Sequence, residues 1–269
     1  MQKVFVTADK LERNGRFIDT RFDMQNTELG MQIYEKSHIE GAIYWDLDKN
    51  LSDMSKNEGR HPLPNKEQLQ QLFEQAGLHV NDAIYIYDQG ASPFATRAWW
   101  ILKYAGFKHA YIVNGGYDAL VAAGFKSSAE IPHYMPTKLD IQWDDSILMT
   151  RGDVLNIVEG NHKATLLDAR ANGRYKGDFE PIDPIAGHIP TAKNYDWEQL
   201  KNHSELVITS SLLEKVGKED EIVIYCGSGV TATPVYSVLM EAGYKNVKIY
   251  MGGYSDWIQH HPVELGENL

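Results

Sequence analysis

Cys226, the only cysteine among 269 residues, is the side chain best placed for chemistry. It follows the apolar run Ile222 to Tyr225 and opens a six-residue segment, CGSGVT, that ends at Thr231. A helical pattern begins there, so the order is a strand, a glycine-bearing loop and a helix N-terminus. Such a loop directs backbone N–H groups and the partial positive charge of a helix end toward its centre. A thiol held there should ionise below its usual pKa of about 8.5, which predicts a thiolate nucleophile.

The lack of a second thiol limits what this nucleophile can do. No resolving cysteine exists within the chain, so a dithiol relay is excluded and any acceptor must come from outside. A lone cysteine is ordinarily an inert, buried hydrophobic residue. The strand end, the two glycines of the loop and the helix start favour function instead. The sequence leaves three roles open for Ser228 in the loop: a hydrogen-bond donor, a group that helps to move a proton, or a small residue that fits the turn.

The composition limits the partners and the location of the chain. Apolar residues make up 43% and charged residues 23%, as in an ordinary globular protein, and the net charge is −11. This negative charge disfavours a nucleic-acid partner. No apolar run approaches the roughly 18 residues of a membrane span, and the first residues lack the apolar core of a signal peptide. One cysteine cannot form an internal disulfide, so the expected location is cytoplasmic.

The chain repeats itself, which predicts two copies of one domain. Four blocks recur in the same order and at nearly constant spacing. The matched pairs are Asp19-Thr20-Arg21 with Asp168-Ala169-Arg170, His38-Ile39 with His188-Ile189, Ile84–Asp88 with Ile222–Cys226, and Asn114–Tyr117 with Met251–Tyr254.

Each copy alternates short apolar runs with helical spacing. This alternation predicts an α/β fold of two tandem domains, each a parallel sheet flanked by helices. We expect the first domain at residues 1–125, a proline-containing linker at 126–147 and the second domain at 148–269. Asn65 and Thr150 are the expected N-caps of two of the helices.

The two copies serve as controls for each other, because features present in both are expected to be structural. Asp168-Ala169-Arg170 therefore predicts a buried ion pair, and His38 and His188 are expected to be core histidines. The copies diverge at the end of a central strand, where open parallel sheets bind their ligands, and Asp88 there replaces the cysteine. We expect no comparable cradle in the first copy, because Pro93 lacks an N–H and the paired glycines are missing.

The segment CGSGVTA resembles the active-site loop of the rhodanese superfamily, and most closely that of its 3-mercaptopyruvate sulfurtransferase branch. The second copy resembles the catalytic domain of that family, and the first resembles its inactive N-terminal domain. The matching landmarks are Asp168-Ala169-Arg170, Gly173-Arg174-Tyr175, Glu180-Pro181 and Gly187-His188-Ile189-Pro190. The resemblance implies a persulfide on Cys226, the sulfur carrier. It also implies a donor site formed by Arg174, Gly227, Ser228, Gly229, Val230 and Thr231.

The same resemblance implies a sulfurtransferase that moves sulfane sulfur from thiosulfate or 3-mercaptopyruvate to cyanide or a thiol, without metal or cofactor. Mercaptopyruvate enzymes usually carry an arginine after the Glu-Pro pair, where this chain has Ile182. Thiosulfate enzymes usually carry basic loop residues, which are missing here. We therefore expect both donors to be used, with a modest preference for 3-mercaptopyruvate. In some family proposals a first-domain histidine joins the loop serine, and the matching residue is His38, although its repetition as His188 favours a core role.

Two other functions are compatible with parts of the pattern. A non-catalytic persulfide carrier fits the lack of a second donor-binding arginine, and turnover with a small donor and cyanide would distinguish an enzyme from it. A phosphatase of the same fold needs a C-x5-R loop in which arginine clamps the phosphate. Position 232 is alanine and the loop holds no arginine, which disfavours a phosphatase.

Overall fold

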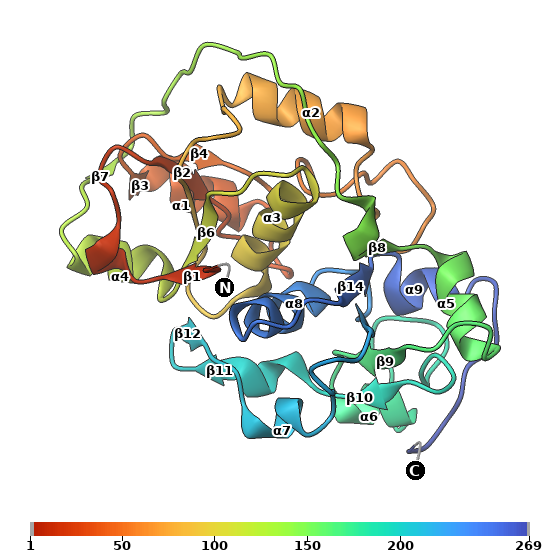
Figure 1. Cartoon of the computed structure of the whole chain (residues 1–269). Helices are drawn as coiled ribbons and strands as arrows, with labels where there is room; N and C mark the ends of the chain where they lie inside the picture. Colours follow the sequence, from red (N-terminus) through yellow and green to blue (C-terminus); the bar gives the residue numbers. More distant parts are fainter. Residues whose placement is uncertain (1–2, 268–269) are drawn as a thin grey trace.

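The computed structural model describes residues 3–267 as two α/β units that lie side by side (Figure 1). The outermost residues of the two predicted domains, 1–2 and 268–269, lie outside the described residues. Within the described chain, no helix is long and apolar enough to cross a membrane.

The first unit is built on a sheet of five parallel strands in the order β1-β6-β5-β2-β4. These strands are β1 (Phe5–Val6), β2 (Arg16–Asp19), β4 (Ile43–Tyr44), β5 (Ile84–Tyr87) and β6 (Ala110–Val113). The helices of this unit are η1 (Ala8–Lys10), α1 (Leu29–Lys36), α2 (Lys66–Gln75), α3 (Pro93–Tyr104) and α4 (Gly116–Ala122). A separate antiparallel ribbon pairs β3 (His38–Ile39) with β7 (Ser127–Ser128).

The second unit is built on five parallel strands in the order β10-β9-β13-β14-β8. These strands are β8 (Leu148–Met149), β9 (Thr165–Asp168), β10 (Lys193–Asn194), β13 (Ile222–Tyr225) and β14 (Val247–Tyr250). The helices are η2 (Asp145–Ile147), α5 (Arg151–Val158), α6 (Asn172–Lys176), η3 (Trp197–Leu200), α7 (Ser210–Leu213), α8 (Ala232–Glu241) and α9 (Gly253–Trp257). β11 (Lys201–Asn202) and β12 (Glu205–Leu206) form a short hairpin.

The strand orders of the two sheets are the same when one is read from its opposite edge. β4-β2-β5-β6-β1 then corresponds to β10-β9-β13-β14-β8, with β5 and β13 at the centres. All four residues of each central strand are buried, as expected for a parallel sheet covered on both faces. The predicted fold class and the internal repeat are therefore confirmed.

Local sequence signals place the helices that border the sheets. Asn65 and Thr150 cap α2 and α5, and each forms the reciprocal hydrogen bonds of a capping box with the residue three positions on. Gly106 and Gly243 follow α3 and α8 with φ of +79° and +82°, the left-handed conformation that favours glycine after a helix.

The two units meet along α3 and α8, which pack against each other (Figure 1). Thr96 and Thr233, at corresponding positions of the two helices, share a hydrogen bond of 2.8 Å between their hydroxyl groups. Both helices are buried along most of their length, and one cluster of buried hydrophobic side chains contains residues of both units. The contact between equivalent helices is the arrangement that a two-fold relation between repeats produces.

Residues 129–144 connect the units without helix or strand. In Figure 1 this green segment runs along the outside of α2 before it reaches β8. Thr137 donates from its backbone to the carbonyl of Glu74 at 2.9 Å, so the connection is held against the helix. The exact domain limits at 125 and 148 stay predictions.

Gly253 provides a test of the close packing between α9 and the end of β13. Its φ is +65°, and a Cβ there would lie 2.7 Å from the carbonyl oxygen of Cys226. Gly160 has a φ of +77° with nothing within 4 Å, so it is a matched control for backbone strain alone. We expect Gly253→Ala to lower the free energy of unfolding by about 3 kcal/mol and Gly160→Ala by about 1 kcal/mol. Urea denaturation measures both, and equal losses would contradict the steric argument.

Candidate active site

Cys226 lies at the carboxyl end of β13, where the chain turns toward α8. Two backbone hydrogen bonds tie this turn to α9: Tyr254 donates to the carbonyl of Cys226 at 2.7 Å, and Ser255 donates to the next carbonyl at 2.9 Å. Gly229 has a φ of +72°, and a Cβ there would lie 2.4 Å from the carbonyl oxygen of Met251. Only glycine fits so close an approach of two backbones. Cys226 itself is 1% exposed, so a reactant reaches its sulfur only if the covering groups move.

The backbone N–H groups after Cys226 have no partner in the described chain. Between residues 3 and 267, no hydrogen bond is donated by the N–H groups of Gly227, Ser228, Gly229, Val230 and Thr231. The first four of these residues are buried, and Thr231 is half-buried. Unpaired N–H groups in an interior are rare, because each costs about as much as a lost hydrogen bond. The loop therefore offers a row of donors to an acceptor held beside the cysteine.

The equivalent turn of the first unit directs two of its backbone N–H groups to its own aspartate. The carboxylate of Asp88 accepts the backbone N–H of Gly90 at 2.8 Å and that of Ala95 at 3.1 Å. Burial raises the pKa of Asp88 to about 6, although these hydrogen bonds oppose the shift. The expectation that the first copy forms no cradle comparable to that of the second stays a prediction. One donor precedes Pro93 and the other follows it, and the side chain of the loop's own first residue binds both.

Ser228 contacts a histidine from the first unit. Its Oγ lies 2.8 Å from Nδ1 of His61, and Nε2 of the same ring lies 3.5 Å from Oδ1 of Asp48. Burial, together with the positive charges of Arg97 and Arg60, lowers the pKa of His61 to about 4. The imidazole is therefore neutral at pH 7 and can exchange a proton with the serine hydroxyl.

His38, the first-domain histidine that the family resemblance aligned with this role, lies elsewhere. Its ring is fully buried, and its nitrogens contact the carbonyls of Tyr34 at 2.7 Å and Glu130 at 3.0 Å. His188 is equally buried and contacts the carbonyl of Tyr175 at 2.8 Å. The predicted core role of both histidines is confirmed.

Sequence reasoning missed His61, although the repeat contains a signal that could have found it. Ile84 follows Asp46 by 38 positions, whereas Ile222 follows Asp196 by only 26. The first copy therefore carries an insertion between its matched blocks. His61 lies in this extra segment, next to Arg60.

Arg97 is a second residue that the sequence did not single out. It lies on α3, is fully buried, and its Nη1 donates to the carbonyl of Gly229 at 3.0 Å. Its Nη2 donates to the carbonyls of Leu51 at 3.1 Å and His61 at 3.2 Å. No carboxylate pairs with this guanidinium within the described chain, and burial lowers its pKa to about 10. Arg97 thus joins the cysteine loop to the segment that carries His61.

Arg174 lies on α6 near the loop, and its role in binding the donor stays a prediction. It belongs to an ion-pair network in which its Nη2 lies 2.7 Å from Glu180 and 3.1 Å from Asp183. Asp183 also pairs with Arg60 of the first unit. A Cβ placed on Gly227 would lie 2.3 Å from Nη2 of Arg60 and 3.8 Å from Nη2 of Arg174. Two arginines from different units therefore cover the loop.

The buried ion pair predicted from the repeat is present in both copies. Arg170 contacts Asp168 at 2.7 Å, and Arg21 contacts Asp19 at 2.6 Å. Each arginine also donates to a backbone carbonyl, that of Gly187 for Arg170. These pairs stabilise the two sheet ends rather than contact the cysteine loop.

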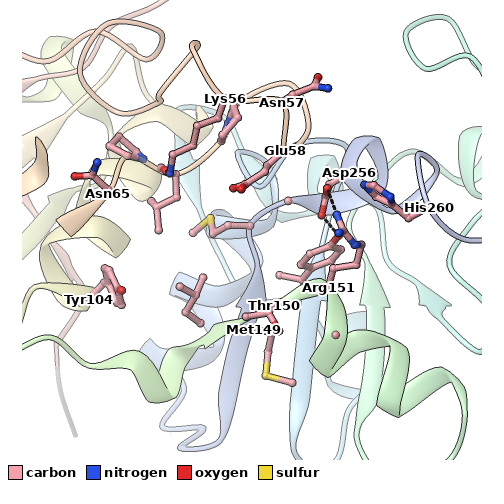
Figure 2. Close-up of a pocket in the computed structure, with 18 of the residues that line it drawn as sticks. Lys56, Asn57, Glu58, Asn65, Tyr104, Met149, Thr150, Arg151, Asp256 and His260 are labelled. Carbon is pink, nitrogen blue, oxygen red and sulfur yellow. Dashed lines mark hydrogen bonds and ion pairs between the residues drawn. The ribbon is translucent and has the colours of Figure 1, made fainter. Parts of the chain in front are cut away.

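A large groove is lined by residues of both units (Figure 2). It has a volume of about 1080 Å³ and runs from the first-unit segment Lys56–Glu58 to the start of α5. Figure 2 shows Arg151 paired with Asp256 in its wall. Neither Cys226 nor residues 227–231 line this groove, so its size does not make it the reaction centre.

The lowered pKa of His61 predicts a specific pH dependence of stability. Below pH 6.5 an unfolded histidine gains a proton that folded His61 does not accept until about pH 4. As the pH falls from about 6.5 to about 4, the free energy of unfolding of the wild type should therefore decrease by about 3 kcal/mol relative to that of His61→Gln. Above pH 6.5 the difference between the two proteins should not change with pH. Asp88 acts with the opposite sign in both proteins, so the difference between them isolates His61. Denaturation of wild type, His61→Gln and the exposed control His79→Gln at pH 4 to 8 measures it, and parallel curves would refute the assignment.

Comparison with known proteins identifies the family to which both units of the chain are similar. The family model for the rhodanese-like domain matches residues 7–123 and 150–260. A relative from Pseudomonas aeruginosa, named a probable 3-mercaptopyruvate sulfurtransferase, is 34% identical over 93% of this chain and 92% of its own length. A relative from Mycobacterium tuberculosis, provisionally named a thiosulfate sulfurtransferase, is 30% identical over 89% of this chain and 86% of its own.

Solved structures agree with the sequence comparison. The crystal structure of the 3-mercaptopyruvate sulfur-transfer enzyme SseA from Escherichia coli is 28% identical, with a TM-score of 0.81 over 94% of this chain and 99% of its own. The matched blocks of the repeat and the cysteine loop lie within the matched regions, and the edge strands β1 and β8 lie just before them. This chain therefore belongs to the rhodanese-like family and carries two of the family's domains in tandem.

Proposed function

We propose that this protein is a sulfurtransferase that carries sulfane sulfur as a persulfide on Cys226. The donor is 3-mercaptopyruvate or thiosulfate, and the acceptor is a thiol or cyanide. The names of the relatives support the donor class. The backbone N–H groups of the loop, which have no acceptor in the described chain, support the role of the cysteine.

The observation that carries the proposal is the contrast between the two equivalent loops. In the first unit, the carboxylate of Asp88 accepts two backbone N–H groups, that of Gly90 in the loop and that of Ala95 in the first turn of α3. In the second unit the corresponding donors have no acceptor in the described chain, and a cysteine replaces the aspartate. A persulfide anion extends further from the backbone than a thiolate and carries its charge at the outer sulfur. Its terminal sulfur would then accept the hydrogen bonds that a carboxylate oxygen accepts in the first unit.

Each half-reaction balances through this one sulfur. With thiosulfate, the Cys226 thiolate bonds to the outer sulfur, the S–S bond breaks, and sulfite leaves with the electron pair. With 3-mercaptopyruvate, the C–S bond breaks, the electron pair stays on the methylene carbon, and the donor's thiol proton moves to that carbon to give pyruvate. The acceptor then removes the sulfur and restores the thiolate.

The contact between Ser228 and His61 fits the donor that needs a proton moved. Transfer from thiosulfate requires no proton, whereas transfer from 3-mercaptopyruvate requires one to travel from sulfur to carbon. A neutral imidazole at 2.8 Å from a serine hydroxyl can receive a proton and return it. This pair supports 3-mercaptopyruvate as the preferred donor, while Ile182 at the usual second-arginine position supports only a modest preference.

The assignment of Cys226 predicts a mass change. Incubation with either donor should add about 32 Da, the mass of one sulfur atom, and a small thiol should remove it. Cys226→Ser should gain no mass and transfer no sulfur to cyanide. Wild-type protein alkylated beforehand with iodoacetamide is the control for adventitious sulfur. Sulfur transfer by the serine variant would exclude the mechanism.

The role of the Ser228–His61 pair predicts a difference between donors. His61→Gln and Ser228→Ala should lower kcat with 3-mercaptopyruvate by about a hundredfold, because general acid–base transfer contributes on that order. With thiosulfate the same variants should change kcat less than about threefold, since no proton moves. Steady-state assays with both donors on one preparation test this. Equal losses with both donors would show that the pair only shapes the loop.

A persulfide carrier that does not turn over small donors is the second candidate. The burial of Cys226 and the acidic partners of both covering arginines favour it, because they restrict access and lower the local positive charge. Measurable kcat with a small donor and cyanide excludes this candidate. A stoichiometric burst without turnover favours it.

A further inference from the structure

Asp183 occupies the position between two arginines that an anionic donor would need. One of its carboxylate oxygens pairs with Nη1 of Arg60, and the other accepts a hydrogen bond from Nη2 of Arg174 at 3.1 Å. These are the only side-chain partners of this carboxylate within the described chain. Its side chain is 3% exposed although it follows Ile182, which is 59% exposed. The carboxylate is therefore directed inward, onto the arginines.

The neighbouring acid, Glu180, has a different function. Besides Arg174 it contacts Arg170 at 3.2 Å and accepts the backbone N–H groups of Ile182 and Asp183 at 3.1 Å each. Removing it would break the local fold of the segment. The carboxylate of Asp183 accepts no backbone N–H group within the described chain, so it can leave the arginines without breaking backbone hydrogen bonds.

The charges show what this arrangement does to an incoming anion. Arg60 and Arg174 are offset by Asp183 and Glu180, so the four groups sum to no net charge. The arginine Nη2 atoms are also the groups nearest to Gly227 of the cysteine loop. With Asp183 in place, a donor's acidic group meets a cluster whose charges cancel and in which each arginine already shares one nitrogen with the carboxylate. Once Asp183 is displaced, the same cluster has one excess positive charge beside Cys226.

We propose that Asp183 is an internal competitor of the anionic donor, holding Arg60 and Arg174 together over the cysteine loop until the donor's acidic group replaces it. Asp183 lies in residues 178–187, which contain no helix or strand, so its displacement requires no secondary structure to unfold. The proposal rests on the proposed function for the nature of the ligand. It makes a separate claim about which anions reach Cys226, which is testable without sulfur transfer.

The test compares two alkylating reagents that differ in charge. Iodoacetate and iodoacetamide both form a bond from the Cys226 thiolate to carbon with loss of iodide, but only iodoacetate is an anion. We expect the ratio of the iodoacetate to the iodoacetamide rate constant to rise about tenfold in Asp183→Asn and Asp183→Ala. Asp178→Asn is the matched control, because it removes the same charge five residues away from an exposed position that pairs with neither arginine. Its ratio should change less than about twofold.

Donor kinetics complete the test and separate the two proposals. Asp183→Asn and Asp183→Ala should lower the KM for both anionic donors by about tenfold, while Asp178→Asn leaves it unchanged. If no variant turns over a donor but the alkylation ratio rises, the proposed function fails and the competitor role of Asp183 stands. An unchanged or lower ratio, or a raised KM, would mean that Asp183 positions the arginines for the donor, and this would overturn the inference. Circular dichroism of each variant identifies any loss of fold, and the neutral reagent normalises for altered thiolate content.

Discussion

The candidate site depends on one buried guanidinium. Arg97 comes from α3 of the first unit and donates to three backbone carbonyls, one in the cysteine loop and two in the segment that brings Arg60 and His61. A buried charge is costly unless its donors are used, so the carbonyls must stay where they are. Arg97 therefore fixes the position of the cysteine loop relative to the segment that carries Arg60 and His61. The α3–α8 contact places Arg97 within reach, and its hydrogen bonds in turn make the interface between the units specific.

The two cysteine-loop equivalents show how a duplicated fold acquires asymmetric chemistry. The two turns share one close contact: Gly116 and Gly253 both have positive φ, and a Cβ on either would press on the carbonyl of Asp88 or of Cys226. The repeated Gly-Gly-Tyr block is thus explained by close packing rather than by catalysis. The chemical difference is one side chain, because a carboxylate reaches back to its own loop amides and a thiol does not. In the first turn two donors are satisfied by its own aspartate, whereas the donors of the cysteine loop are available to a ligand.

The cover of the cysteine loop is shared between the units, and this makes the first unit part of the chemistry. Arg60 and His61 come from a segment that the second copy lacks, whereas Arg174 and Asp183 come from the second unit. One ion pair, between Arg60 and Asp183, joins the two sets over a loop in which Cys226 is 1% exposed. The first copy has lost the nucleophile but contributes a cation and an imidazole directly above the loop of the second.

The sequence by itself determined the parts that depend on neighbours along the chain. The strand-like runs, the caps at Asn65 and Thr150, the repeat, the fold class and the glycine-bearing loop at Cys226 all follow from short-range patterns that local backbone physics enforces. The buried Asp168–Arg170 pair could also be predicted, since its members are two residues apart and occur in both copies.

Only the tertiary structure decided which side chains from distant parts of the sequence contact the cysteine loop and one another. His61 rather than His38 meets Ser228, Arg97 crosses the interface, and Asp183 bridges two arginines that are 114 positions apart in the sequence. No local sequence pattern predicts these contacts. Each depends on how α3 and α8 pack and on where the extra segment of the first copy, between Asp46 and Ile84, lies in the fold. The unused amides of the cysteine loop are likewise invisible in the sequence, since a hydrogen bond that is not made can be identified only when every possible partner has been placed in space.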